Sequence, residues 1–205
     1  MITALHYTSN RESEPFKVKN KDMIKNRIEL AKYFNELGFK YGAEIGACFG
    51  RYSEILCQNI PGLKLIAIDS WSNRRNTKRE DIAKISGEES TRIKLAPYNA
   101  VVIRASSMDA LPYVEDGTLD FVFIDADHKY DSVAEDIREW SKKVRVGGIV
   151  SGHDYYIFKN SGNRGVIDAV DEYVKKHGIE LLTTSWDKKN PVSDDCQPCR
   201  YFFKK

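Results

Sequence analysis

The sequence predicts an α/β fold: a doubly wound sheet of seven strands, mostly parallel, with an antiparallel C-terminal strand and helices on both faces. Apolar runs of strand length alternate with helical patterns between residues 43 and 153, which is the order of a parallel sheet. These runs are nearly continuous in Val, Ile and Phe, as expected for strands buried on both faces. The last two runs, 179–186 and 199–205, leave no room for a helix between them, so they form an antiparallel pair.

The composition predicts a single soluble domain, residues 21–205, preceded by a polar arm, residues 1–20. The chain has 205 residues, of which 41% are hydrophobic and 30% charged. Its 32 basic and 30 acidic side chains leave a net charge of +2, which favours neither nucleic acid nor a membrane as the main partner. There is no apolar run of membrane-spanning length and no signal-peptide pattern, so we expect a cytoplasmic location.

The predicted elements begin with a capping helix at 21–38, where apolar side chains recur at helical spacing and Gly38 provides a stop. Further helices are expected near 51–59, 107–113, 130–143 and 163–177. The predicted strands are 43–46, 63–69, 99–105, 118–126, 146–153, 179–186 and 199–205. The segment 70–97 is polar and rich in Arg, and the pattern gives no helix bounds for it.

The first strand ends in a Glu-x-Gly-x-x-x-Gly turn that runs from Glu44 to Gly50. Glycine lets the backbone approach a ligand closely, and the free N–H groups of the following helix favour an anionic group such as a carboxylate. A tight turn without a ligand is the alternative. The second strand ends in Asp69, an acid that can accept hydrogen bonds from ribose hydroxyls or, alternatively, cap the next segment.

The same turn argues against a nicotinamide cofactor. A dinucleotide fingerprint requires Gly-x-Gly-x-x-Gly, whereas Cys48 and Arg51 stand where the second and third glycines would be. With the acid Asp69 and the antiparallel last strand, the chain resembles the class I S-adenosylmethionine-dependent methyltransferases, which have a Rossmann-like fold. A nicotinamide-dependent oxidoreductase and a non-catalytic module that binds a cofactor or partner remain the alternatives.

The resemblance is most specific over residues 120–155, which are similar to the methyltransferase family 24 type, relatives of sugar and macrolide O-methyltransferases. It implies that the first turn wraps the amino-acid end of S-adenosylmethionine, that Asp69 holds the ribose and that residues 105–108 lie along the adenine. Many relatives have an acid where Ser106 stands, which is a departure at the adenine contact. The implied cofactor residues are Glu44, Gly46, Ala47, Cys48, Phe49, Gly50, Asp69, Ser70, Ser106, Ser107, Met108 and Asp125.

Two acidic strand ends follow, Asp125-Ala126-Asp127-His128 and His153-Asp154-Tyr155. Core packing does not require such a concentration of charge, so these residues are candidates for chemistry. The resemblance implies Asp125 and Asp154 as ligands of a metal such as Mg²⁺ and Asp127 as a candidate base. From the residues themselves we predict that Asp127 or His128 deprotonates an alcohol, with His153 and Asp154 orienting the acceptor or a metal bound to it. Because His153 replaces an expected acid, either Mn²⁺ is used or no metal is bound.

Each of these residues also has a structural interpretation. Asp125 could pair only with the ammonium group of the cofactor, and Asp127 could cap the helix that starts near residue 130. His128 and His153 could serve as structural hydrogen-bonding groups.

The expected acceptor is a small-molecule or sugar hydroxyl. Four basic residues within 71–79 predict a lid for an anionic acceptor such as a nucleotide-sugar, the alternative being a solvated helix face. RNA modification ranks last because an Asn/Asp-Pro-Pro-aromatic motif is missing. The cluster at 155–158 could stack on a sugar or pack the next helix, and the Cys196–Cys199 pair could be a redox or zinc site or incidental thiols. A homo-oligomer is compatible with the sequence.

Overall fold

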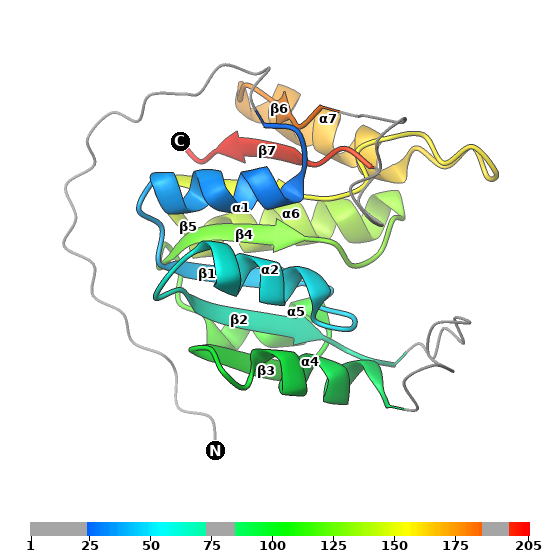
Figure 1. Cartoon of the computed structure of the whole chain (residues 1–205). Coiled ribbons are helices and arrows are strands. Elements are labelled where there is room, and N and C mark those ends of the chain that lie inside the picture. Colours follow the sequence, from blue (N-terminus) through cyan, green and yellow to red (C-terminus); the bar gives the residue numbers. More distant parts are fainter. Residues whose placement is uncertain (1–23, 73–84, 186–196) are drawn as a thin grey trace.

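The computed structural model describes residues 24–72, 85–185 and 197–205 (Figure 1). The predicted arm at 1–20, the basic cluster at 74–79 and Cys196 lie outside these residues. In the described part of the chain, no helix combines the length and the apolar character that crossing a membrane requires.

The sheet has seven strands in the order β3-β2-β1-β4-β5-β7-β6. All pairings are parallel except those of β7, which runs antiparallel to both β5 and β6. This arrangement confirms the predicted fold class. Because the strand order reverses between β1 and β4, the crevice for a ligand is expected at the carboxyl ends of those two strands. The strands are β1 (Tyr41–Ile45), β2 (Lys64–Asp69), β3 (Ala100–Arg104), β4 (Leu119–Ile124), β5 (Val144–Gly152), β6 (Leu182–Thr183) and β7 (Arg200–Phe203).

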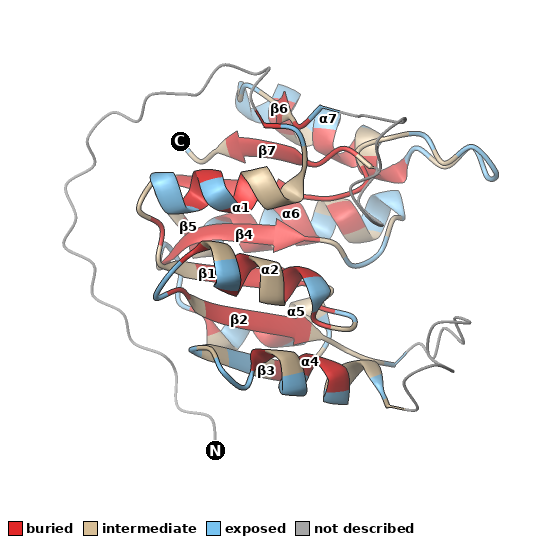
Figure 2. Ribbon diagram, viewed as in Figure 1, coloured by how far each residue is buried: buried red, intermediate tan, exposed pale blue. Residues whose placement is uncertain are grey.

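Helices cover both faces of the sheet (Figure 1). One layer consists of α1 (Arg27–Glu36), α2 (Arg51–Asn59) and α4 (Gly87–Leu95). The other consists of α5 (Ser107–Ala110), the short 3₁₀ helix η2 (Leu111–Tyr113), α6 (Tyr130–Lys143) and α7 (Gly165–His177). The central strands are buried between these layers (Figure 2), and all six residues of β4 are buried.

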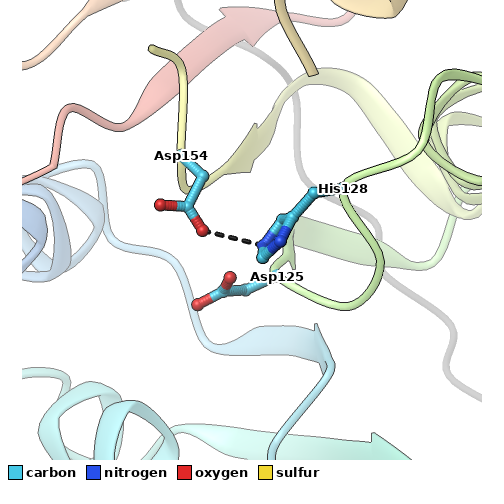
Figure 3. A group of neighbouring side chains, drawn as sticks. All are labelled: Asp125, His128 and Asp154. Carbon is cyan, nitrogen blue, oxygen red and sulfur yellow. Dashed lines mark ion pairs between the residues drawn. The ribbon is translucent and has the colours of Figure 1, made fainter. Parts of the chain in front are cut away.

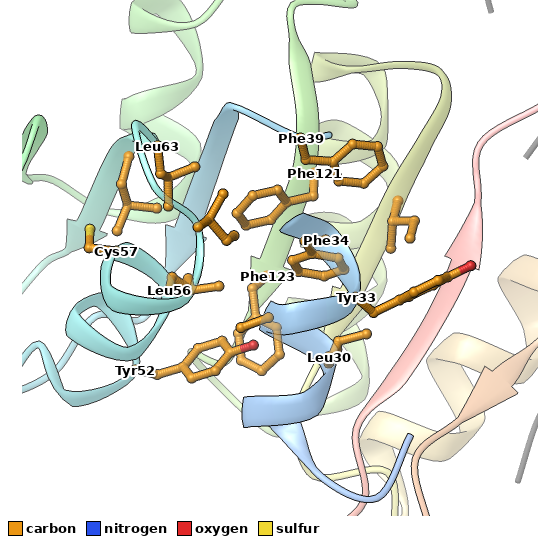
Figure 4. Packing of buried hydrophobic residues seen from close by; sticks show 14 of the residues in the cluster. Leu30, Tyr33, Phe34, Phe39, Tyr52, Leu56, Cys57, Leu63, Phe121 and Phe123 are labelled. Carbon is orange, nitrogen blue, oxygen red and sulfur yellow. The ribbon is translucent and has the colours of Figure 1, made fainter. Parts of the chain in front are cut away.

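Two hydrophobic cores result, one on each side of the sheet. In the first, the Phe34 ring stacks on Phe121 with centroids 4.5 Å apart, and the Tyr52 ring lies 4.2 Å from Phe123 (Figure 4). The second contains the fully buried Trp140 of α6. Burial on both sides explains why the strand sequences show no polar alternation.

Three elements depart most from the prediction, whereas the bounds of the others differ by a few residues at most. Helix α1 begins at Arg27 rather than near residue 22, because the Asn26 side chain caps it by accepting from the N–H groups of Ile28 and Glu29. Helix α4 lies within the polar segment 70–97; its buried face includes Ser90 and Thr91, so it lacks an apolar period. The predicted strand 179–186 is reduced to β6, two residues long.

Candidate active site

The turn after β1 packs directly on the end of β4. Gly46 has a φ of +94°, and a Cβ at this position would lie 2.1 Å from the carbonyl oxygen of Asp125. Its N–H donates to the Ile68 carbonyl oxygen at 2.8 Å. A side chain at Gly46 would therefore separate the turn from β4, so packing alone already requires glycine.

The rest of the turn is joined to the end of β2. Cys48 has a φ of +51°, and its N–H donates to Asp69 Oδ2 at 2.9 Å, while its carbonyl oxygen accepts from Trp71 Nε1 at 2.7 Å. Gly50, with a φ of +72°, is the N-cap of α2, and a Cβ there would lie 2.8 Å from the Cα of Thr91. The turn is thus held in one conformation by β2, β4 and α4.

Asp69 has the capping role that the sequence left open, because its Oδ1 accepts from the Trp71 N–H at 2.7 Å. Each of its oxygens receives one backbone N–H, and a carboxylate oxygen can accept a second hydrogen bond. The cap is therefore compatible with ribose recognition. Of the neighbouring predicted residues, Ala47 is buried, Phe49 is half-buried, and Ser70 Oγ lies 2.8 Å from Ser72 Oγ.

Glu44 is 2% exposed and accepts a hydrogen bond from the Ser53 hydroxyl on α2. Burial raises the pKa of its carboxyl group to about 8; the Ser53 hydrogen bond opposes this shift, and the charges of Asp125 and Asp69 add to it. The sequence analysis did not identify Ser53. Ser53 could have been found from its position nine residues after Glu44, because that spacing places the two residues on either side of the turn.

The predicted adenine segment begins helix α5. The Ser106 hydroxyl caps the helix by accepting from the Asp109 N–H at 3.1 Å. The Ser107 hydroxyl donates to Asp136 and accepts from Trp140 Nε1 at 2.8 Å, so it faces α6. Burial raises the pKa of Asp136 to about 6. Met108 is half-buried against the second core. Contacts of this segment with adenine remain a prediction.

Asp125, His128 and Asp154 come together at the ends of β4 and β5 (Figure 3). His128 Nε2 lies 2.8 Å from Asp154 Oδ2. One potential ligand atom from each of the three side chains lies within 4.8 Å of the others. The two strands are neighbours in the sheet, so residues about 25 positions apart form one cluster.

His153 is 7% exposed and adjoins both acids of this cluster. Its Nδ1 is 3.4 Å from Asp154 Oδ1 and 3.9 Å from Asp125 Oδ2, so the ring lies between the two acids. Burial would raise the pKa of Asp154, but hydrogen bonds from His128 and His153 outweigh it and hold the pKa well below its usual range. Asp154 is therefore a carboxylate at neutral pH.

Asp127 interacts instead with the start of α6. Its oxygens accept from the His128 N–H at 2.8 Å and from the Ser132 hydroxyl at 3.0 Å. Burial tends to raise its pKa, yet these hydrogen bonds lower it overall. No described side chain caps the first turn of α6, so Asp127 is not the predicted helix cap, but both of its oxygens already accept hydrogen bonds. Asp127 is therefore a weaker candidate for the base than His128.

One charged residue of the site was missed by the sequence analysis. Arg200, the first residue of β7, is 3% exposed and donates from Nη1 to the carbonyl oxygen of His153. Burial lowers its pKa to about 10, while the carboxylates of Asp125 and Asp154 favour the charged form. Its sequence neighbourhood is an ordinary short strand, so only the pairing of β7 with β5 identifies it.

A family model described as a methyltransferase domain matches residues 43–155, which include the first turn and both acidic strand ends. The chain belongs to this methyltransferase family. The predicted relation to class I S-adenosylmethionine-dependent methyltransferases of the family 24 type is confirmed. The chain is also 30% identical over 149 residues to protein R132 of Acanthamoeba polyphaga mimivirus. That match covers 71% of the chain and 63% of R132, so it extends over less than two thirds of the relative.

Solved structures share the fold of this chain at low sequence identity. Cofactor-bound Rv0187 from MTB superposes with a TM-score of 0.64 at 14% identity, covering 86% of this chain and 80% of that one. An O-methyltransferase from Bacillus cereus in complex with SAH gives 0.59 at 15% identity, with coverages of 85% and 80%. A putative rRNA methylase from Clostridium thermocellum has the same fold, with a TM-score of 0.60, 13% identity and coverages of 93% and 100%. The fold therefore does not identify the methyl acceptor.

Proposed function

We propose that this chain is an S-adenosylmethionine-dependent O-methyltransferase that acts on a hydroxyl group of a small molecule or sugar. The observation that carries the proposal is the pair formed by His128 and Asp154, 2.8 Å apart, at the strand ends beside the glycine turn. A hydroxyl acceptor needs a base, and a histidine oriented by a buried carboxylate is suited to that role.

The cofactor would lie along the carboxyl edge of β1, β2 and β4. The turn from Gly46 to Gly50 would contact the methionine end with its backbone, which the positive φ angles of Gly46, Cys48 and Gly50 fold tightly at the carboxyl edge of the sheet. Asp69 would accept hydrogen bonds from the ribose with its remaining lone pairs. Asp125, which follows β4, would pair with the cofactor's ammonium group.

Methyl transfer is an in-line displacement, so the main task of the protein is to align the acceptor oxygen with the methyl group. The oxygen forms a bond to the methyl carbon, the bond from that carbon to the sulfonium breaks, and neutral S-adenosylhomocysteine leaves. The acceptor's proton goes to His128. Because Nε2 lies 2.8 Å from Asp154 Oδ2, we assign the hydrogen of the neutral ring to Nε2 and the role of proton acceptor to Nδ1. Asp154 stabilises the resulting imidazolium.

Asp125, His128 and Asp154 also fit a divalent cation, because their two oxygens and one nitrogen converge within 4.8 Å. Mixed oxygen and nitrogen donors suit Mn²⁺ better than Mg²⁺. A cation bound there would polarise the acceptor oxygen as a Lewis acid. Occupation of Nε2 by a metal would displace Asp154 from His128, so the two arrangements are distinguishable by experiment.

The test is a calorimetric titration with S-adenosylhomocysteine in EDTA, in Mg²⁺ and in Mn²⁺, with NADH as the control ligand. We expect S-adenosylhomocysteine to bind and NADH not to bind. Labelled S-adenosylmethionine is then offered with catechols, nucleotide-sugars and ribosomal RNA in parallel. Transfer to a hydroxyl supports the proposal, whereas transfer to RNA alone, or binding of NADH in place of S-adenosylhomocysteine, contradicts it.

A further inference from the structure

We propose that Arg200 is a positioning residue: its guanidinium, supplied by the antiparallel strand β7, fixes the turn at His153 and Asp154 and thereby holds the Asp154 carboxylate against His128. The inference rests on the proposed function, since it assigns a role in orienting the base of that reaction. Arg200 would act through Asp154 and need not touch the substrate.

The sheet register places Arg200 beside the last residue of β5. Gly152 of β5 is the pairing partner of Arg200, and a Cβ on Gly152 would lie 2.6 Å from both Cζ and Nη2 of the guanidinium. Glycine thus leaves the space that the guanidinium occupies. From this position Nη1 donates to the carbonyl oxygen of His153, the next residue along the chain.

The turn that follows has an unfavourable backbone conformation. Asp154 has a φ of +60°, in the left-handed region that side chains other than glycine rarely adopt. Such a conformation persists only where surrounding contacts determine it. On the β4 side, the His153 N–H donates to the Ile124 carbonyl oxygen at 3.2 Å. On the β7 side, the Tyr155 N–H donates to the Pro198 carbonyl oxygen at 3.0 Å, and Arg200 supplies a further contact through the His153 carbonyl oxygen.

Charge provides a second reason to assign Arg200 to the site. A buried guanidinium is costly to desolvate, and apolar residues often replace buried charges without loss of stability. Arg200 nevertheless lies among three carboxylates, Asp125, Asp136 and Asp154, and no carboxylate within the described residues forms a close ion pair with it. A cation placed in this way compensates the acidic cluster as a whole while leaving Asp154 available to His128.

The test uses NMR of protein labelled with ¹⁵N in its histidines, with His128→Asn to assign the His128 signals. In the wild type we expect a downfield Nε2–H resonance, because the Asp154 carboxylate accepts that hydrogen. In Arg200→Met we expect this resonance to be lost or shifted upfield. Arg200→Lys, which keeps the charge but not the planar fork, should restore part of the shift.

The matched control is Arg145→Met. Arg145 belongs to β5 itself and donates from Nε to Asp120 at 2.8 Å, at the opposite end of the strands. It should lower stability while leaving the His128 resonance unchanged. An unchanged resonance in folded Arg200→Met overturns the inference, as does an unchanged resonance in Arg200→Lys if the Met variant does not fold. Titration of each protein with S-adenosylhomocysteine separates the two proposals: failure of the wild type to bind sinks the proposed function, whatever the resonance does.

Discussion

Strand β4 has one aspartate near its amino end and another just after its carboxyl end, and the two carboxylates differ in how many hydrogen bonds they accept from the protein. Asp120, at the amino end, accepts from the backbone N–H groups of Lys40 and Tyr41 at 2.6 and 2.9 Å and from Arg145 at 2.8 Å. Asp125 follows the carboxyl end, and its side chain has, among the described residues, only an ionic contact with His153 at 3.9 Å. The first carboxylate is saturated by the protein, whereas the second retains its capacity for a ligand.

The contrast extends to the two edges of the sheet. At the amino edge, Asp120 joins the chain before β1 to β4 and β5, which is a structural role. At the carboxyl edge, charged side chains at or just after the ends of β4, β5 and β7 gather around Asp154. The strand order assigns the ligand to the carboxyl edge, and the polar groups at the two edges agree with that assignment.

The largest expected effect comes from Gly46→Ala, which acts where the cofactor turn meets Asp125. The new Cβ would lie 2.1 Å from the Asp125 carbonyl oxygen, at a φ of +94°. We expect loss of detectable S-adenosylhomocysteine binding by calorimetry and a large fall in Tm. Gly62→Ala is the control, because Gly62 also has a positive φ but no atom within 4 Å of a Cβ. It should cost about 1 kcal/mol and leave binding intact. If both variants lost S-adenosylhomocysteine binding and Tm to the same extent, backbone strain alone, and not the contact with β4, would explain the effect of Gly46→Ala.

The second-largest expected effect is on the rate of methyl transfer. His128→Ala should slow methyl transfer by roughly 10²- to 10⁴-fold, the usual contribution of a general base, while S-adenosylhomocysteine still binds. The rate is measured by release of S-adenosylhomocysteine with whichever acceptor the screen identifies. His177→Ala, on the exposed end of α7, is the control and should retain full activity. Turnover at the wild-type rate in His128→Ala would remove the basis for a catalytic role of this edge.

The comparison of the two aspartates can be tested directly with a pair of Asn variants. Asp120→Asn should lower the free energy of unfolding by about 3 to 5 kcal/mol, because it breaks a buried ion pair, and should leave S-adenosylhomocysteine affinity unchanged. Asp125→Asn should change stability by less than about 1 kcal/mol and weaken binding. Urea denaturation and calorimetry measure the two quantities. If both variants lose stability equally, Asp125 is a structural residue like Asp120.

The smallest effect concerns Glu44 and depends on pH. Its pKa is raised by burial from 4.5 to about 8, so the unfolded chain ionises first as pH rises. Between these values the wild type loses stability with increasing pH, and above pH 8 the loss is complete. Glu44→Gln cannot ionise, so its stability relative to the wild type should rise steadily between pH 5 and pH 8. Melting curves at both pH values measure it.

The control for Glu44 is Glu89→Gln on α4, where the side chain is exposed. Its melting temperature should follow that of the wild type at both pH values. A difference between Glu44→Gln and wild type that stays constant with pH would show that Glu44 is ionised in the folded protein.

Most of the fold followed from local patterns in the sequence. Helix α6 has the predicted bounds 130–143, and β4 was recognisable as an apolar run. Helix α4 was not predicted, because it buries hydroxyl side chains: the Thr91 hydroxyl donates to the Cys48 carbonyl oxygen at 3.1 Å. Its place depends on a tertiary contact that no local period encodes.

The site was predictable in its acids and not in its geometry. Strand ends identified Asp125 and Asp154, because residues at the carboxyl ends of neighbouring parallel strands meet. The sequence could not show that the Asp127 side chain contacts Ser132 while the His128 side chain contacts Asp154. Both orientations depend on where the backbone enters helix α6. Nor could it show Arg200, whose role follows from the insertion of β7 between β5 and β6.

The position of β7 also constrains the order of folding. Among the described strands, β6 pairs only with β7, and β7 pairs with β5, which ends 48 residues before β7 begins. The five parallel strands up to β5 can therefore assemble first, and the sheet is completed by a late insertion that closes a long loop. Because Arg200 arrives with that insertion, we expect a refolding chain to recover its secondary structure before it recovers activity.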